Sequence, residues 1–289
     1  MTTIRPRRSV LYMPGSNARA LEKARTLSAD ALILDLEDAV APDAKELARQ
    51  QVCEAVKARG FGKREVIIRV NGLSTPWGEA DLRAAAEAEP DAILVPKISS
   101  ASELNFIEAK LGGAAASIAV WAMVETPAAI LGIAAIAAAG GRLACFVMGT
   151  NDLIKEIRGV HTQDRINLAA ALSLSVLAAR ANGIAVIDGV YNDIQNADGF
   201  KATCEQARAF GFDGKTLIHP SQVEPCNAVF APSPEEVDAA RKLIAAFDLP
   251  ENKGKGAIKL DGRMVELLHA DIARGTVAMA DAIAALEAA

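Results

Sequence analysis

The stretch ALILDLEDAVAPDAKELARQQVCEAVKAR, residues 31–59, contains the unit that much of the chain repeats. Its first part, Ala31–Leu36, is a short, strongly apolar run that ends in acids, which is typical of a buried strand. Its second part, Asp43–Arg59, is rich in Ala, Glu, Lys and Arg, which favour a helix. The stretch therefore predicts one strand followed by one helix.

The same alternation of strand and helix continues to about residue 230. Seven further strands are predicted at Ser9–Met13, Glu65–Val70, Ala92–Val95, Ile118–Val124, Leu143–Met148, Ile184–Ile187 and Gly214–Leu217. Helical segments between them include Ser102–Lys110, Asn167–Asn182 and Asn196–Phe210. Eight such units are the number that closes a (β/α)8 TIM barrel, the α/β fold that we predict. The alternative is a doubly wound sheet, but Pro14-Gly15 is not the Gly-rich phosphate turn that often follows its first strand.

The chain changes character after the eighth unit. Pro232-Ser233-Pro234 interrupts the pattern, and a helix is expected from Ser233 to about Phe247. The Gly- and Lys-rich segment Gly254–Gly262 is interpreted as a flexible hinge. An amphipathic helix is predicted at Met264–Leu286.

The predicted domain division follows from this change. We expect a catalytic barrel at residues 1–231 and a C-terminal helical extension at residues 232–289. The extension is too short to bury much surface alone. It is therefore predicted to pack on the barrel or on a neighbouring subunit, as a lid or an oligomerisation segment.

Composition excludes several classes of function. Hydrophobic residues make up 51% of the chain and charged residues 23%, which indicates a packed globular protein. The net charge of −5 offers no basic surface for nucleic acid or anionic lipid, and no apolar run is long enough to span a membrane. The four cysteines lack the spacing of a zinc site and there is no signal segment, so a cytoplasmic protein with reduced thiols is expected.

Acidic side chains gather where the predicted strands end. They are Asp35, Glu37, Asp38, Glu125, Asp152 and Asp188. In a barrel, catalytic groups lie at these C-terminal strand ends. Carboxylates that share one pocket repel one another unless a cation holds them, and oxygen ligands favour a hard ion such as Mg2+ or Mn2+. Arg69, inside an apolar strand, needs an anionic partner, and binding a carboxylate is the usual task of such an arginine.

Several of these residues also have a simpler interpretation. Glu125 could be an acid at a helix N-terminus, and Asp152 could be an N-cap. Lys97 could form a Schiff base with a carbonyl substrate, or it could be the ion-pair partner of the acids.

Seven motifs, in order along the whole chain, resemble those of the HpcH/HpaI aldolase/citrate lyase family. They are Arg8–Gly15 (RSVLYMPG), Leu34–Val40 (LDLEDAV), Ile68–Asn71 (IRVN), Pro96-Lys97, Val124–Pro127 (VETP), Gly149–Leu153 (GTNDL) and Asp261–Glu266 (DGRMVE). Within this family, the chain is most similar to the citrate lyase beta subunit-like proteins and the malyl-CoA lyases.

The resemblance implies a Mg2+-dependent carbon–carbon lyase. Its substrate would be a 3-hydroxyacyl-CoA such as malyl-CoA or citramalyl-CoA, which yields an acyl-CoA and a 2-oxoacid, glyoxylate or pyruvate. The reverse condensation, which forms the same compound, is also open. Glu125 and Asp152 would be the metal ligands, with Glu125 also beside the substrate. Arg69 would bind the oxoacid or a developing enolate oxygen, and the amides of Gly149, Thr150 and Asn151 would bind its carboxylate.

The resemblance also assigns supporting and catalytic roles to other acids. Asp35, Glu37 and Asp38 would order metal-bound water around the site. Many family members form trimers or larger rings in which an aspartate of the tail completes a neighbouring site. Here Glu266 stands at that position, with Asp261 just upstream, and a homotrimer or hexamer is expected.

Four other functions remain open from the sequence. They are hydrolysis of the same CoA thioester, a free-acid class II aldolase using pyruvate, a Schiff-base aldolase through Lys97, and a non-catalytic subunit that binds an oxoacid. The C-terminal extension favours a CoA ester over a free acid. The intact acidic pair with Arg69 favours an enzyme over a binder.

Overall fold

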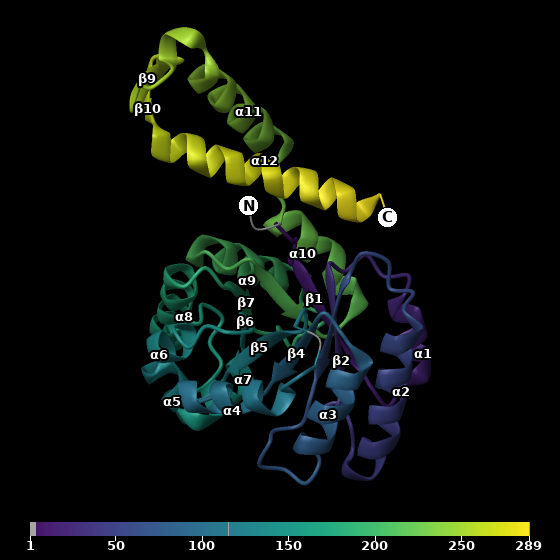
Figure 1. Ribbon diagram of the computed structural model, residues 1–289. Helices are drawn as coiled ribbons and strands as arrows, with labels where there is room; N and C mark the ends of the chain where they lie inside the picture. Colours follow the sequence, from purple (N-terminus) through teal and green to yellow (C-terminus); the bar gives the residue numbers. More distant parts are fainter. Residues whose placement is uncertain (1–3, 115, 289) are drawn as a thin grey trace. The chain divides into compact units, whose positions relative to one another are not determined.

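The computed structural model describes residues 4–114 and 116–288, which fall into two compact units (Figure 1). One unit is Arg7–Phe230. The other contains the described residues from Ala231 onward together with residues 4–6. Each unit has its own apolar core and is described separately.

The first unit is a closed barrel of parallel strands in chain order (Figure 1). The strands are β1 (Ser9–Pro14), β2 (Ala31–Asp35), β3 (Glu65–Arg69), β4 (Ala92–Val95), β5 (Ala119–Val124), β6 (Leu143–Met148), β7 (Ala185–Asp188) and β8 (Gly214–Leu217). Strand β1 pairs with both β2 and β8, so the sheet has no free edge. The predicted (β/α)8 barrel is confirmed, and every predicted strand lies within one residue of an observed one at each end.

Helices surround the barrel and connect its strands. They are α1 (Ala18–Ala24), α2 (Lys45–Ala58), α3 (Gly78–Ala88), α4 (Ala101–Leu111), α5 (Pro127–Leu131), α6 (Ile133–Ala137), α7 (Thr150–Glu156), α8 (Ala169–Ala181), α9 (Ala197–Phe210) and α10 (Val223–Phe230), with short 3-10 turns η1 (Pro42–Ala44), η2 (Ile166–Leu168) and η3 (Pro220–Gln222). The predicted helix Asp43–Arg59 starts as the turn η1 because Pro42 fits a first helical turn.

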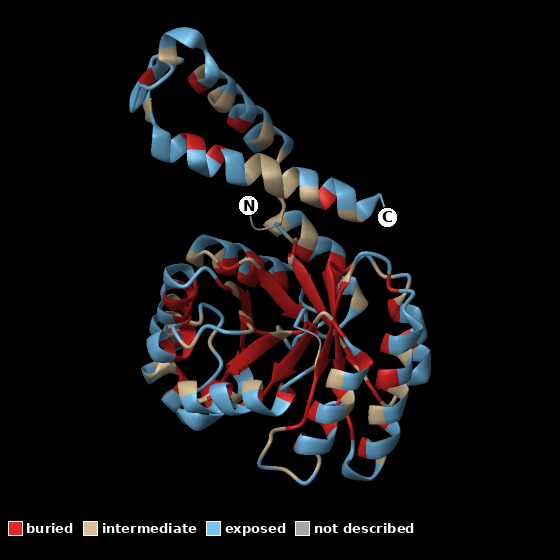
Figure 2. Ribbon diagram, in the orientation of Figure 1, coloured by how far each residue is buried: buried red, intermediate tan, exposed pale blue. Residues whose placement is uncertain are grey.

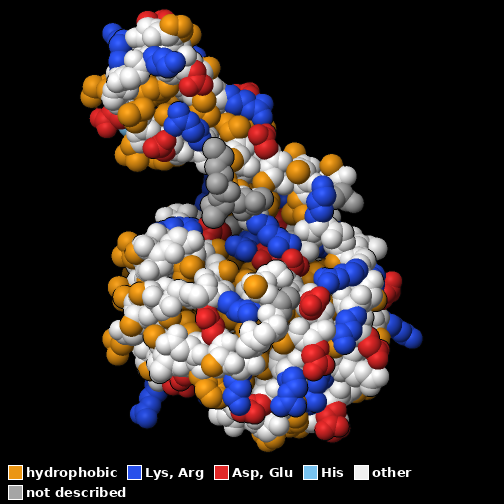
Figure 3. Space-filling model, in the orientation of Figure 1, with side chains coloured by type: hydrophobic (Ala, Val, Ile, Leu, Met, Phe, Trp, Pro, Cys, Tyr) orange, Lys and Arg blue, Asp and Glu red, His pale blue; other side chains and the backbone are white. Residues whose placement is uncertain are grey.

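The barrel strands are mostly buried (Figure 2), and apolar side chains fill both of their sides. Ile67 and Leu94 belong to the cluster inside the barrel, whereas the neighbouring Ile68 and Ile93 pack outward against the helices. Because both faces are apolar, polar chemistry is confined to the strand ends. On the visible face of the barrel unit, acidic and basic side chains are interspersed (Figure 3).

The second unit is a helix, a hairpin and a long helix. Its elements are α11 (Pro234–Asp248), η4 (Pro250–Asn252), β9 (Ala257–Leu260), β10 (Arg263–Glu266) and α12 (Leu267–Glu287). Ser233 caps α11 and accepts the Glu236 N–H, as predicted for a helix that starts there. Phe247, Ile258 and Ala270 form its small core. Within the described residues, no helix is long and apolar enough to cross a membrane.

The hinge predicted at Gly254–Gly262 was wrong, and so was the start of the last helix. Strands β9 and β10 pair antiparallel across the two-residue turn Asp261-Gly262. Both turn residues have positive φ, 49° and 81°, as a tight hairpin turn of this kind requires. An Asp-Gly pair between two short strands is a strong hairpin signal, and Met264 therefore lies in a strand and not in α12.

Gly214 should be a packing constraint of the barrel. A Cβ at this position would collide with the backbone carbonyls of Arg7 and Arg8. We expect Gly214→Ala to lower the free energy of unfolding by ~1–3 kcal/mol, the usual range for overpacking. The matched control is Gly275→Ala in α12, where a Cβ meets nothing within 4 Å. That variant should gain up to ~1 kcal/mol from helix propensity in denaturant titrations. Equal stability of the two variants would contradict this account.

Candidate active site

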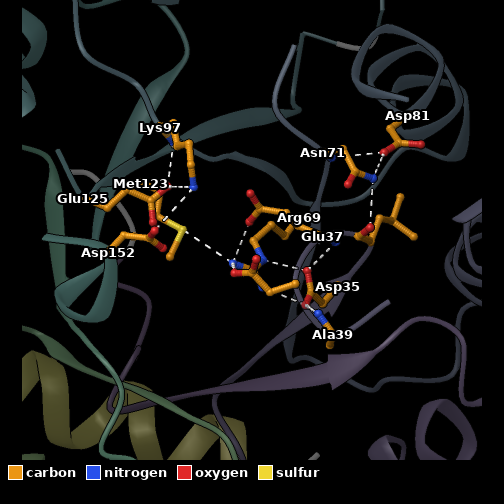
Figure 4. A network of polar contacts seen from close by, with 12 residues as sticks. Asp35, Glu37, Ala39, Arg69, Asn71, Asp81, Lys97, Met123, Glu125 and Asp152 are labelled. Atoms are coloured by element: carbon orange, nitrogen blue, oxygen red, sulfur yellow. Dashed lines mark hydrogen bonds and ion pairs between the residues drawn. The ribbon is translucent and has the colours of Figure 1, made fainter. Parts of the chain in front are cut away.

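A cavity of about 300 Å3 lies at the C-terminal ends of the strands. Six of the predicted site residues line it: Asp35, Arg69, Gly149, Thr150, Asn151 and Asp152. Glu37 and Glu125 belong to the same network of polar contacts (Figure 4). Of the predicted site residues, only Glu266 belongs to the other unit.

Arg69 is buried and is bound by Asp35 through two parallel contacts. Its Nε lies 2.6 Å from Asp35 Oδ1 and its Nη2 lies 2.7 Å from Asp35 Oδ2. The pair forms because Asp35 and Arg69 are register partners at the ends of β2 and β3. Arg69 Nη1 also contacts Glu37 at 2.8 Å and Asp38 at 3.2 Å. Three acids therefore surround one guanidinium.

Asp35 holds the following loop as well as Arg69. Its carboxylate accepts the backbone N–H groups of Glu37 at 2.9 Å and Ala39 at 3.0 Å. With Arg69, it has four hydrogen-bond donors. This favours a positioning role for Asp35 over the predicted role of ordering metal-bound water.

Glu37 ionises at an unusual pH. Burial raises its pKa to about 7. The nearby Arg69 opposes this rise, but Asp35 already balances most of its charge. Glu37 can therefore exchange a proton close to neutral pH.

Glu125 and Asp152 lie on the opposite side of the network from Asp35 (Figure 4). The Lys97 ammonium stands 3.9 Å from Glu125 Oε1 and 3.7 Å from Asp152 Oδ1. Glu125 Oε1 also accepts the Lys97 backbone N–H at 2.8 Å, while Lys97 itself adopts φ of 56°. Burial raises the pKa of Glu125 to about 7, although Lys97 lowers it. A glycine is needed at position 149, since a Cβ there would collide with the Glu125 side chain.

Neither of these two acids is the N-cap of the helix that follows it. The N-cap of α5 is Thr126, whose hydroxyl accepts the Ala129 N–H at 3.1 Å, so Glu125 is free to turn into the network. The N-cap of α7 is Gly149, so Asp152 is not a cap.

The two carboxylates suit a hard divalent cation. Mg2+ is commonly held by one or two protein carboxylates, with waters and substrate oxygens completing its shell. Glu125 and Asp152 meet that requirement, and the pKa of Glu125 is raised first by its burial and, to a smaller extent, by the neighbouring Asp152 carboxylate. Among the described residues, no group of three or more His, Cys, Asp or Glu side chains forms a more complete metal cage.

A buried network that sequence reasoning missed fixes the loop after β2. Lys45 Nζ donates to the carbonyls of Leu36 at 2.8 Å and Glu37 at 2.7 Å, and to Asn71 Oδ1 at 2.7 Å. Asn71 in turn donates to Asp81. Lys45 carried no signal in the sequence, because a lysine in a first helical turn usually lies in solvent.

Asp188, the other acid at a strand end, is not part of this cavity. It is fully buried against Lys215 Nζ at 2.7 Å and Arg165 Nη1 at 2.8 Å. Burial alone would raise its pKa, but these two cations hold the pKa of Asp188 below its usual range. It forms a closed structural ion cluster.

The two tail acids occupy the second unit. Glu266 is exposed at the N-cap of α12, where its N–H donates to His269 Nδ1 at 3.0 Å. Asp261 lies in the hairpin turn and pairs with Lys242 at 2.7 Å. The catalytic role predicted for Glu266 stays a prediction.

Known proteins resemble the chain over nearly its full length. Residues 8–220 match the model of the HpcH/HpaI aldolase/citrate lyase family. The chain is 52% identical to a (3S)-malyl-CoA thioesterase of Cereibacter sphaeroides, over 98% of both chains. It is 34% identical to citrate lyase subunit beta of Escherichia coli, over 96% of this chain and 94% of that one. The solved structure of CitE from Mycobacterium tuberculosis, in complex with magnesium, acetoacetate and coenzyme A, matches with a TM-score of 0.77 and 29% identity, over 94% of this chain and 97% of that one.

The raised pKa of Glu37 predicts a specific effect of pH on stability. Between its ordinary value of 4.5 and about 7, the folded state binds the proton more tightly than the unfolded state. Wild-type stability should therefore fall relative to Glu37→Gln as pH rises through this window, by up to ~3 kcal/mol, and then level off. Urea unfolding at a series of pH values, without divalent cations, measures it. The exposed Glu87→Gln is the control, and parallel curves for wild type and Glu37→Gln would contradict the assignment.

Proposed function

We propose a function from one premise, that this chain belongs to the HpcH/HpaI aldolase/citrate lyase family, as its motifs indicated. It is an enzyme of that family. Its proposed reaction is Mg2+-dependent hydrolysis of the thioester of a 3-hydroxyacyl-CoA such as malyl-CoA. The main structural support for this reaction is the arrangement at the cavity, where Arg69 lies on one side and the pair Glu125 and Asp152 lies on the other.

The relatives favour hydrolysis over the carbon–carbon cleavage that the sequence alone suggested. Four relatives named (3S)-malyl-CoA thioesterase are 48–52% identical over 98% of the chain. Relatives named citrate lyase subunit beta are 32–34% identical over 90–96% of the chain. A closer relative is the better guide to reaction and substrate, although fold alone implies neither.

Glu125 and Asp152 are proposed to hold the metal, with Mn2+ as an alternative to Mg2+. When bound, the ion supplies Lewis-acid polarisation of a carbonyl oxygen. Lys97 is not needed as a nucleophile. Burial alone would lower its pKa, but Glu125 and the other acids raise it overall, so the amine stays protonated and unsuited to forming an imine.

The remaining groups bind and orient the acyl part and move the proton. Arg69, fixed by Asp35, binds a carboxylate or an oxygen that becomes negative. The backbone amides of Thr150 and Asn151 are proposed to bind the other end of the acid. The Gly149 N–H, to which the sequence also assigned this task, already donates to the Val124 carbonyl at 3.0 Å. In hydrolysis, a water oxygen bonds to the thioester carbon and the C–S bond breaks. The water proton passes to Glu37, whose pKa near 7 suits a base, and then to the departing thiolate.

Carbon–carbon cleavage is the second candidate, because the family description includes aldolases and lyases. The same groups would serve it, with a base taking the proton of the 3-hydroxyl as the C2–C3 bond breaks. Glu266 is proposed to handle the proton at the thioester α-carbon in that reaction. A cytoplasmic homotrimer or hexamer is proposed from the family resemblance.

The decisive experiment incubates the purified enzyme with malyl-CoA and Mg2+. Hydrolysis should release malate and free CoA in equal amounts, without glyoxylate. Glyoxylate with acetyl-CoA would instead establish the lyase. Turnover of neither product pair, with Mg2+ present, would contradict both reactions and leave a free-acid aldolase or a non-catalytic oxoacid binder.

Loss of either metal carboxylate should abolish cooperative binding of Mg2+ and an oxoacid. We expect Glu125→Gln and Asp152→Asn each to weaken Mg2+–pyruvate binding at least about 100-fold in calorimetry, because even outer-shell changes reach that size. Without metal, both variants should be as stable as wild type or more so, since like charges are removed. Glu156→Gln, an exposed acid on the same helix as Asp152, is the control. Binding unchanged in both variants would rule out this metal site.

A further inference from the structure

Tyr12 borders the same cavity but belongs to none of the interactions described so far. It lies on β1. The Arg69 guanidinium carbon stands 4.8 Å from the centre of that ring, an arrangement typical of a cation–π contact. The Tyr12 hydroxyl is buried and has no hydrogen-bond partner among the residues that the structure describes.

A buried hydroxyl without a partner is costly, and few are found in folded proteins. Within the described chain, five buried side-chain N or O atoms lack a partner, on Tyr12, Gln51, Trp121, Arg165 and Asn227. Of these five residues, Tyr12 alone lines the cavity that holds Arg69 and Asp152. An orphaned O–H on a residue that lines this cavity therefore indicates that a bound ligand group is its partner.

Two of the carboxylates near Tyr12 already accept hydrogen bonds from other donors. Asp35 receives four donors, and Glu125 accepts the Lys97 N–H. Burial raises the pKa of Tyr12, so the phenol stays protonated and acts as a donor. A neutral donor beside the Arg69 cation suits an oxygen with partial negative charge, such as a carboxylate or carbonyl oxygen.

We propose that Tyr12 is a specificity-determining residue that donates a hydrogen bond to an oxygen of the bound acyl or oxoacid group. The inference rests on the proposed function, because that function supplies the oxygen. A site that places a buried O–H opposite a ligand oxygen discriminates strongly against ligands that bring no oxygen to that position. With such a ligand, the O–H donor is left without a partner. Tyr12 and Arg69 together select an acid that presents an oxygen to both of these donors.

The test is the substitution Tyr12→Phe, which removes the hydroxyl and keeps the ring beneath Arg69. In the presence of Mg2+, the dissociation constant for pyruvate should rise about tenfold, the effect of losing one hydrogen bond. Thermal stability should not fall, because the variant loses an orphaned polar atom. The chain has two tyrosines, so Tyr191→Phe, outside this cavity, is the matched control.

Labelling with 3-fluorotyrosine gives a direct readout. The two fluorine resonances are assigned by the two phenylalanine variants, and pyruvate with Mg2+ should shift the Tyr12 resonance only. If wild type binds pyruvate but Tyr12→Phe binds it equally well, or the Tyr12 resonance does not move, the inference is overturned. If wild type neither binds pyruvate with Mg2+ nor turns over malyl-CoA, that result contradicts the proposed function itself. The role of Tyr12, which rests on that function, is then contradicted as well.

Discussion

The bidentate ion pair between Arg69 and Asp35 is the interaction on which the arrangement of the site depends. A guanidinium this deeply buried is tolerated only when it is paired, and removing its partner typically costs ~3–5 kcal/mol. The pairing follows from barrel register, which sets the last residues of β2 and β3 side by side. The same carboxylate also accepts two N–H groups from the loop that carries Glu37. One acid thus fixes both the cation and the neighbouring acid.

The two ends of the barrel differ in how their acidic and basic side chains are paired. At the N-terminal ends of the strands, Arg7 pairs with Glu65 at 2.6 Å and Arg8 pairs with Asp30 at 2.9 Å, so acids and bases match. At the C-terminal ends, Asp188 is matched in its own ion cluster, but around the cavity several acids share Arg69 and the half-exposed Lys97. An excess of negative charge is unfavourable for the protein alone and favourable for a protein that takes up a cation. The asymmetry separates the stabilising end of the fold from its reactive end.

Most of the fold could be predicted from the sequence because the signal is local. Each strand is a short apolar run and each long helix has a distinct composition, so the eight strands were identified to within a residue. The segment around Asp261-Gly262 was misjudged because its glycines and lysines were interpreted as flexibility, although the Asp-Gly pair is a hairpin signal. Some features of the site could likewise be predicted from the sequence, and others could not. Acids at strand ends are visible in a linear sequence, but the burial of Lys45 and the orphaned hydroxyl of Tyr12 exist only after the chain has folded.

Gly149 links two parts of the site that come from separate segments of the chain. The turn after β6 is proposed to bind the acid through backbone amides, while the missing side chain at position 149 leaves room for Glu125, which follows β5. Mutagenesis of this turn to change substrate preference is expected to tolerate only glycine at position 149. Any larger residue there displaces a carboxylate from another strand, so an attempt to retune recognition also alters the acidic pair. Adaptation of this barrel to other acids is therefore expected to proceed through the opposite wall of the cavity.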